Sequence, residues 1–150
     1  MKNEIKLQVI INVEPLKVWK TLTEPQFVRK YFYDSILNTT WKEGSELVFY
    51  NDKQGEPLKL VHGKVLKVEK TKRLSYTVFP EDAMYDDVIN NHLTINYQLQ
   101  DLVGKTQLNI LQEGFATVAD GEKRYQDSVE GWNHSIPIIK ETAESIEDLF

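Results

Sequence analysis

The feature that most constrains the fold is an apolar stripe near the C-terminus. Its members recur at spacings of three and four residues: Val129, Trp132, Ile136, Ile139, Ala143 and Ile146. This spacing predicts a long helix with one apolar face. Gly131, beside Trp132, is interpreted as room for a close approach between this helix and a sheet. The apolar face needs a cover, so the rest of the chain must supply a broad surface that receives a helix.

Upstream of this helix, most segments alternate apolar and polar residues. Alternation with period two is typical of half-buried strands. The predicted strands include residues 5–11, 47–50, 58–69, 74–78, 93–99 and 108–110. The apolar residues of 58–69 change phase near Gly63, which predicts a bulge or bend there.

Two short helices are predicted after the first strand. Pro15 follows Glu14, and Pro25 follows Thr23-Glu24, which is typical of helix starts. Thr23 is the expected N-cap of the second helix. Strands followed by a terminal helix indicate an α+β fold, in which a curved antiparallel sheet of about six to seven strands surrounds the C-terminal helix.

Composition narrows the class of protein. The 150 residues are 41% hydrophobic and 27% charged, which predicts a single domain over residues 1–150. A formal net charge of −5 argues against nucleic-acid binding. The absence of cysteine excludes disulfides and thiol catalysis. No signal-peptide pattern and no apolar run of about 18 residues are present, so we expect a cytoplasmic protein without a membrane span.

Five short stretches, in order along the chain, resemble one family. They are Val18-Trp19-Lys20-Thr21-Leu22-Thr23-Glu24-Pro25, Tyr31-Phe32, the hairpin from Gly63-Lys64-Val65-Leu66-Lys67-Val68-Glu69 to Arg73-Leu74-Ser75-Tyr76-Thr77, Glu113-Gly114-Phe115 and Gly131-Trp132. Together they resemble the heat-shock-protein-90 ATPase activator-like branch of the START/SRPBCC superfamily. The resemblance implies the helix-grip fold, in which an apolar ligand usually lies between the sheet and the C-terminal helix.

The residues that usually carry catalysis form no recognisable motif. No Gly-x-Ser-x-Gly elbow occurs, and His62, His92 and His134 lie in no metal-binding pair. We therefore expect no catalytic residue, no metal and no cofactor. His62 and His92 are interpreted as residues of an exposed strand face. The acids Glu81, Asp82, Asp86 and Asp87 are interpreted as a solvated loop.

Aromatic residues predict the walls of a cavity. Ligand sites are mostly apolar with a few placed polar groups, and tyrosine supplies both. The candidate lining residues are Phe32, Phe49, His62, Tyr76, Phe79, Tyr97, Trp132, Ile136 and Ile139. His62, Tyr76 and Tyr97 are the polar tips expected to orient a ligand. Met84 and Tyr85 form a candidate lid over the entrance.

Three functions follow from this pattern. The first is binding of a small apolar or amphipathic ligand, such as a lipid, an aromatic metabolite or a polyketide-like molecule. The second is a cyclase or hydrolase on the same scaffold, which needs an acid–base group beside the ligand. The third is a co-chaperone-like module that binds a protein through its surface and has a filled core, although no motif identifies such a partner. A continuous cavity of about 300 Å³ or more favours the first two.

Overall fold

A seven-stranded antiparallel sheet forms one layer of the molecule. The computed structural model describes residues 3–52 and 55–148. The strands follow the order β1-β7-β6-β5-β4-β3-β2. Their bounds are β1 (Glu4–Ile11), β2 (Ile36–Asn38), β3 (Glu46–Asn51), β4 (Leu58–Glu69), β5 (Arg73–Pro80), β6 (Leu93–Asp101) and β7 (Thr106–Glu113). Each neighbouring pair is a hairpin along the chain, except that the first strand pairs with the last.

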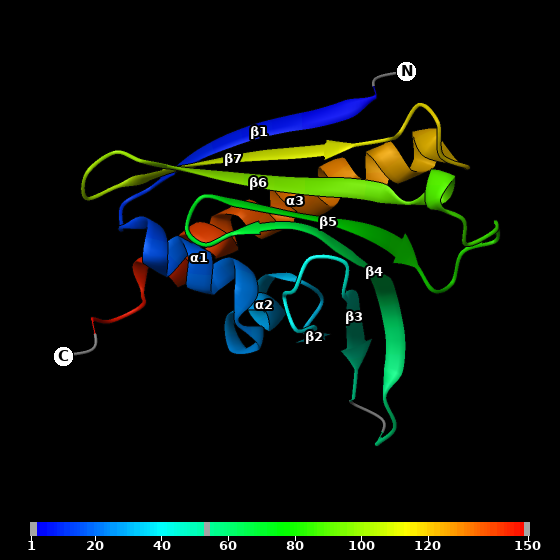
Figure 1. Cartoon of the computed structure of the whole chain (residues 1–150), viewed down its shortest axis with the longest axis horizontal. Coiled ribbons are helices and arrows are strands. Elements are labelled where there is room, and N and C mark those ends of the chain that lie inside the picture. The colour runs from blue at the N-terminus through cyan, green and yellow to red at the C-terminus, as the bar shows by residue number, and fades with distance from the viewer. Residues whose placement is uncertain (1–2, 53–54, 149–150) are drawn as a thin grey trace.

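In the described residues, three α-helices and a short 3-10 helix complete the fold. They are α1 (Pro15–Thr23), α2 (Pro25–Tyr31), η1 (Ile89–Asn91) and α3 (Gly121–Glu144). Figure 1 shows α3 running behind the sheet, while α1 and α2 lie below the long strands; both pack against α3, and α2 also contacts β2. The predicted α+β helix-grip fold is confirmed. The three-residue strand β2 is an addition, because so short a segment has no readable period.

The apolar stripe of α3 packs as its spacing predicts. Trp132, Ile139 and Ala143 are buried, and Val129 and Ile136 pack against the core from partly buried positions. Inward residues of the strands meet them, since alternate side chains of a strand point to one face. In β6, for example, Leu93, Ile95, Tyr97 and Leu99 are all buried. In the described part of the chain, no helix is long and apolar enough to cross a membrane.

Two local predictions need correction, and a third is refined. The N-cap of α2 is Glu24, and Thr23 instead donates its hydroxyl to the carbonyl of Trp19 at 2.8 Å, because Thr23 still belongs to α1. The irregularity predicted near Gly63 is a pair of register shifts that flank this glycine, one between Lys59 and Val61 against β3 and one between Val65 and Lys67 against β5. A Cβ added at Gly131 would meet only the hydroxyl of Tyr33 at 3.8 Å, so this glycine is not a point of close helix–sheet approach.

Candidate functional site

A pocket of about 260 Å³ lies between the sheet and α3. Side chains from the end of α2, from β4 to β7 and from one face of α3 line it. Three of them form an aromatic row, in which the Tyr76 and Tyr97 ring centroids are 6.2 Å apart and those of Tyr97 and Trp132 are 6.1 Å apart. A larger hollow of about 520 Å³ lies on the outer face of the sheet, but polar residues such as Ser75, Asn96 and Gln98 line it. The inner pocket is therefore the candidate site for an apolar molecule.

The polar atoms of the aromatic wall already have partners within the protein. The indole nitrogen of Trp132 donates to Gln112 Oε1 at 2.8 Å. The hydroxyl of Tyr97 donates to that of Tyr76, and the hydroxyl of Tyr31 donates to the carbonyl of Thr21 at 2.9 Å. These bonds fix the rings and leave their faces and edges for contact with a ligand.

Arg124 supplies a positive charge to the pocket lining. Its Nη1 donates to the carbonyl of Asn91 at 2.7 Å, and its guanidinium lies 4.9 Å from the ring centre of Tyr85. Burial lowers the pKa of Arg124, but a guanidinium stays charged at neutral pH. Within residues 3–52 and 55–148, Arg124 forms no ion pair with a carboxylate. Because a guanidinium has five N–H donors, further donors remain for a ligand.

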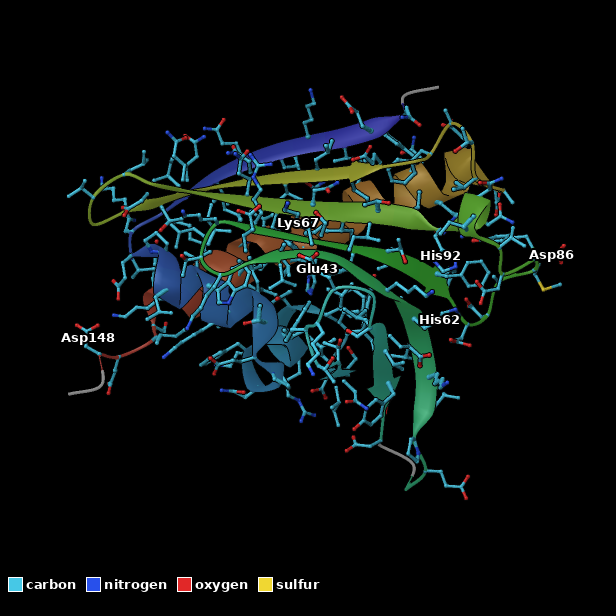
Figure 2. The ribbon with its side chains drawn as sticks, in the orientation of Figure 1. Glu43, His62, Lys67, Asp86, His92 and Asp148 are labelled. Carbon is cyan, nitrogen blue, oxygen red and sulfur yellow. The ribbon has the colours of Figure 1, made fainter. Side chains whose placement is uncertain are left out.

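A second group of polar side chains lies at the rim of this pocket. We call His62, Glu81, Asp87 and His92 the rim cluster. Asp87 Oδ2 lies 2.7 Å from His62 Nε2, and Asp87 Oδ1 lies 2.6 Å from His92 Nε2. The other ring nitrogen of His62 contacts Glu81. Figure 2 shows His62 and His92 together at one end of the sheet.

Strand register assembles the rim cluster. His62 of β4 pairs with Phe79 of β5, and His92 precedes Leu93, which pairs with Val78 of β5. Both imidazoles therefore flank Phe79, at 5.4 Å for His62 and 5.1 Å for His92 between ring centroids. Since Phe79 also lines the pocket, the cluster shares a wall with it.

The charges within the cluster shift its pKa values. Burial lowers the pKa of His62, but its bonds to Glu81 and Asp87 outweigh burial and raise the pKa above its usual value. The hydrogen bond from His92 lowers the pKa of Asp87, burial opposes this, and the bond from His62 lowers it further. Asp87 is therefore held in its charged form between the two rings.

A family model matches most of the chain. The model describes the activator of Hsp90 ATPase homolog 1-like proteins, and it matches residues 12–144. The chain belongs to this family. Among curated proteins, no relative matched the chain.

Solved structures share the fold of this family member. ChR145 from Cytophaga hutchinsonii has a TM-score of 0.75 at 23% identity, covering 96% of this chain and 97% of ChR145. An HSP90 activator from Plasmodium falciparum, PFC0360w, has a TM-score of 0.73 at 12% identity, covering 93% and 95%. CalU16 from Micromonospora echinospora has a TM-score of 0.69 at 15% identity, covering 95% and 76%. At these identities the likeness establishes the fold.

The structure divides the predicted lining residues into two groups. Five of them line the pocket: Phe32, Tyr76, Phe79, Tyr97 and Trp132. Four do not. Phe49 packs against Phe32, with ring centroids 4.2 Å apart. Ile136 and Ile139 pack in the hydrophobic core, and His62 belongs to the rim cluster.

The two residues of the candidate lid, Met84 and Tyr85, differ in their contacts. Tyr85 meets Phe79 edge-on, with ring centroids 5.6 Å apart, and lies under Arg124. Met84 is 98% exposed, so it covers nothing, because the loop turns it away from the protein. Sequence reasoning missed Arg124, which is polar and lies before the apolar stripe. Asp87 lies exposed in a loop, as predicted, but no sequence pattern indicated that its carboxylate contacts His92, which is half-buried rather than on an exposed strand face.

Alkaline pH is expected to destabilise the protein through its buried tyrosines. Burial raises the pKa of Tyr76 to about 12, although the hydrogen bond from Tyr97 opposes the rise. A tyrosine in an unfolded chain ionises near pH 10. The stability contributed by neutral Tyr76 is therefore complete below about pH 10 and is lost as the pH rises to about 12, at up to about 1.4 kcal/mol per pH unit.

Urea unfolding measured between about pH 8 and pH 11.5 tests this expectation. Tyr76→Phe should flatten the fall in unfolding free energy, because phenylalanine has no group that ionises. Tyr33→Phe is the control, since Tyr33 is 71% exposed. Equal slopes in the native chain and Tyr76→Phe would contradict the role of Tyr76.

Proposed function

We propose that the chain binds a small apolar or amphipathic ligand in the pocket between the sheet and α3. The observation that carries this proposal is an aromatic-walled pocket that includes one cation, Arg124. Burial of apolar ligand surface supplies affinity at about 25 cal/mol per Å². Arg124 supplies orientation, because a charge-assisted hydrogen bond favours an acceptor or an anion at one end of the ligand.

The size of the pocket limits the ligand. A volume of about 260 Å³ corresponds to roughly nine water molecules at about 30 Å³ each. This supports a compact aromatic or short aliphatic molecule with an acidic group, rather than a two-chain lipid. This volume lies below the roughly 300 Å³ set above as the criterion for a ligand cavity, so the proposal rests on the aromatic lining and Arg124 rather than on the size of the pocket.

The two alternatives have less support. The rim-cluster histidines are not among the pocket-lining residues, and the carboxylate that is, Asp127, is exposed and paired with Lys123 at 2.7 Å. An enzyme of the cyclase or hydrolase type would need an acid–base group against its substrate. A protein-binding module with a filled core agrees less well with an aromatic pocket. The neighbour from Plasmodium falciparum is an HSP90 activator, but at 12% identity it carries only the fold.

Ligand binding should depend on the space beside Gly131. This residue lines the pocket, and a leucine at this position would extend into open space beside Tyr33. Gly131→Leu is therefore expected to weaken binding at least about tenfold while keeping the helix, since leucine is the better helix former. Asn133→Leu is the matched control, because Asn133 is exposed on the same helix.

Native mass spectrometry of protein purified from its source identifies a bound ligand, and calorimetry with that ligand then compares the affinities of the native chain, Gly131→Leu and Asn133→Leu. Calorimetry with pairs of aromatic carboxylic acids and their methyl esters adds a test of the charge. The native chain should prefer the acid. Arg124→Gln should remove that preference, and Lys123→Gln should keep it, since Lys123 is exposed. Absence of any bound molecule in both experiments would favour the protein-binding alternative.

A further inference from the structure

The rim cluster contains the donor set of a metal site. One ring nitrogen from each of His62 and His92 and a carboxylate oxygen of Asp87 lie within 4.8 Å of one another. Histidine nitrogen and carboxylate oxygen are the ligands that Zn²⁺ and related divalent cations take in proteins. His62 comes from β4, and Asp87 and His92 come from the β5–β6 loop (residues 81–92), His92 as the last residue before β6.

The surroundings of the two rings match the outer shell of a metal site. A metal-bound histidine nearly always donates its other ring N–H to a carboxylate, a carbonyl or another acceptor, which fixes the ring. Nδ1 of His62 contacts Glu81, and Nδ1 of His92 lies 3.1 Å from the hydroxyl oxygen of Thr77. Those contacts leave both Nε2 atoms facing Asp87.

The distances show how little must move to admit a cation. Metal–ligand bonds of about 2.0–2.1 Å in a tetrahedral site place neighbouring ligand atoms roughly 3.3 Å apart. The two Nε2–oxygen distances to Asp87 are 2.7 and 2.6 Å. Withdrawal of Asp87 by less than about 1 Å brings both of these distances to that value. This is feasible because the Asp87 side chain is 49% exposed and belongs to a loop.

We propose that the rim cluster binds one divalent transition-metal cation, with Zn²⁺ as the representative ion. His62 Nε2, His92 Nε2 and Asp87 are the ligands, and a water molecule takes the fourth position. Glu81 and Thr77 are positioning residues that hold the imidazoles. Each imidazole binds through an Nε2 that carries no proton, so on binding a neutral ring transfers its Nε2 hydrogen to Nδ1 and a charged ring releases it to solvent. The cation ties the β5–β6 loop to β4 beside Phe79, at the rim of the pocket.

Calorimetric titration of chelator-treated, tag-free full chain with ZnCl₂ tests the proposal. We expect one Zn²⁺ per chain. Asp87→Asn should weaken binding at least tenfold, whereas Asp86→Asn should change it less than twofold, because the exposed Asp86 points away from the two histidines (Figure 2). Likewise His62→Gln should weaken binding strongly, and His134→Gln on the exposed face of α3 should not.

Two further measurements keep the test decisive if a histidine variant folds poorly. Glu81→Gln should weaken Zn²⁺ binding about 10- to 100-fold, the usual effect of losing an outer-shell partner. Co²⁺ added in place of Zn²⁺ should give the visible absorption bands of a four-coordinate site, and Asp87→Asn should diminish them. Absence of Zn²⁺ binding to the native chain, unchanged affinity in Asp87→Asn, or equal losses in Asp86→Asn would overturn the proposal.

Discussion

Gly63→Ala is expected to lower the free energy of unfolding by about 3 kcal/mol or more. A Cβ at this position would lie 1.7 Å from the carbonyl oxygen of Thr77 and 2.5 Å from its carbonyl carbon. The obstacle is backbone of the neighbouring strand, which has no rotamer to change. Strands β4 and β5 would have to separate, and their separation would disturb the pocket wall at Phe79 and the rim cluster at His62.

Gly131→Ala is the matched control for this substitution. Its added methyl group meets only the hydroxyl of Tyr33 at 3.8 Å, an ordinary contact. Since alanine is favoured over glycine inside a helix by about 1 kcal/mol, the control should be neutral or slightly stabilising. Urea unfolding of both variants makes the comparison. A Gly63→Ala variant as stable as the native chain would show that β4 and β5 can separate at little cost.

Trp132→Ala is expected to lower the free energy of unfolding by about 3–5 kcal/mol. Trp132 is 8% exposed, packs against Tyr97 and donates to Gln112 inside the protein. Truncation leaves a cavity and removes the partner of a buried amide oxygen, and both effects destabilise. Trp132→Phe should cost less, because the ring remains and only the hydrogen bond and part of the volume are lost.

Tyr33→Ala is the control for the loss of an aromatic ring from the same pocket. Tyr33 lines the pocket but is 71% exposed, so its removal should change stability by less than about 0.5 kcal/mol. Chemical denaturation followed by circular dichroism measures both variants. A loss of less than about 1 kcal/mol of unfolding free energy in Trp132→Ala would show that the indole lines the pocket without supporting the core. The larger loss that we expect would show that Trp132 is a core residue that also faces the pocket.

The pocket and the rim cluster have different origins in the sequence. Tyr76, Tyr97 and Trp132 could be predicted as lining, because strand alternation and helical spacing place each of them on an inward face. Phe49, Ile136 and Ile139 follow the same periods but lie outside the pocket. Periodicity identifies the buried face of an element, and it does not distinguish a residue beside empty space from one in the packed core.

The rim cluster depends on register, which the sequence did not reveal. His62 and Asp87 are 25 residues apart, and Glu81 and His62 are 19 apart. Their contact requires that His62 oppose Phe79, and a register slip of one residue would send His62 to the other face. The phase change in β4 predicted an irregularity near Gly63, and register shifts occur on both sides of it, but a phase change does not specify which residue of β5 faces His62.

Local periodicity predicted an α+β fold with a sheet around the C-terminal helix, and the family resemblance identified that fold as the helix-grip fold. Apolar residues recur at every second position in the strands and at every third or fourth position in α3. These spacings specify which faces must be buried, and burial of these faces favours a sheet folded over a helix. Tertiary structure alone decided the volume of the pocket, the placement of Arg124 and the assembly of His62, Asp87 and His92. These properties arise from strand register and side-chain packing between distant segments, which local periodicity does not encode.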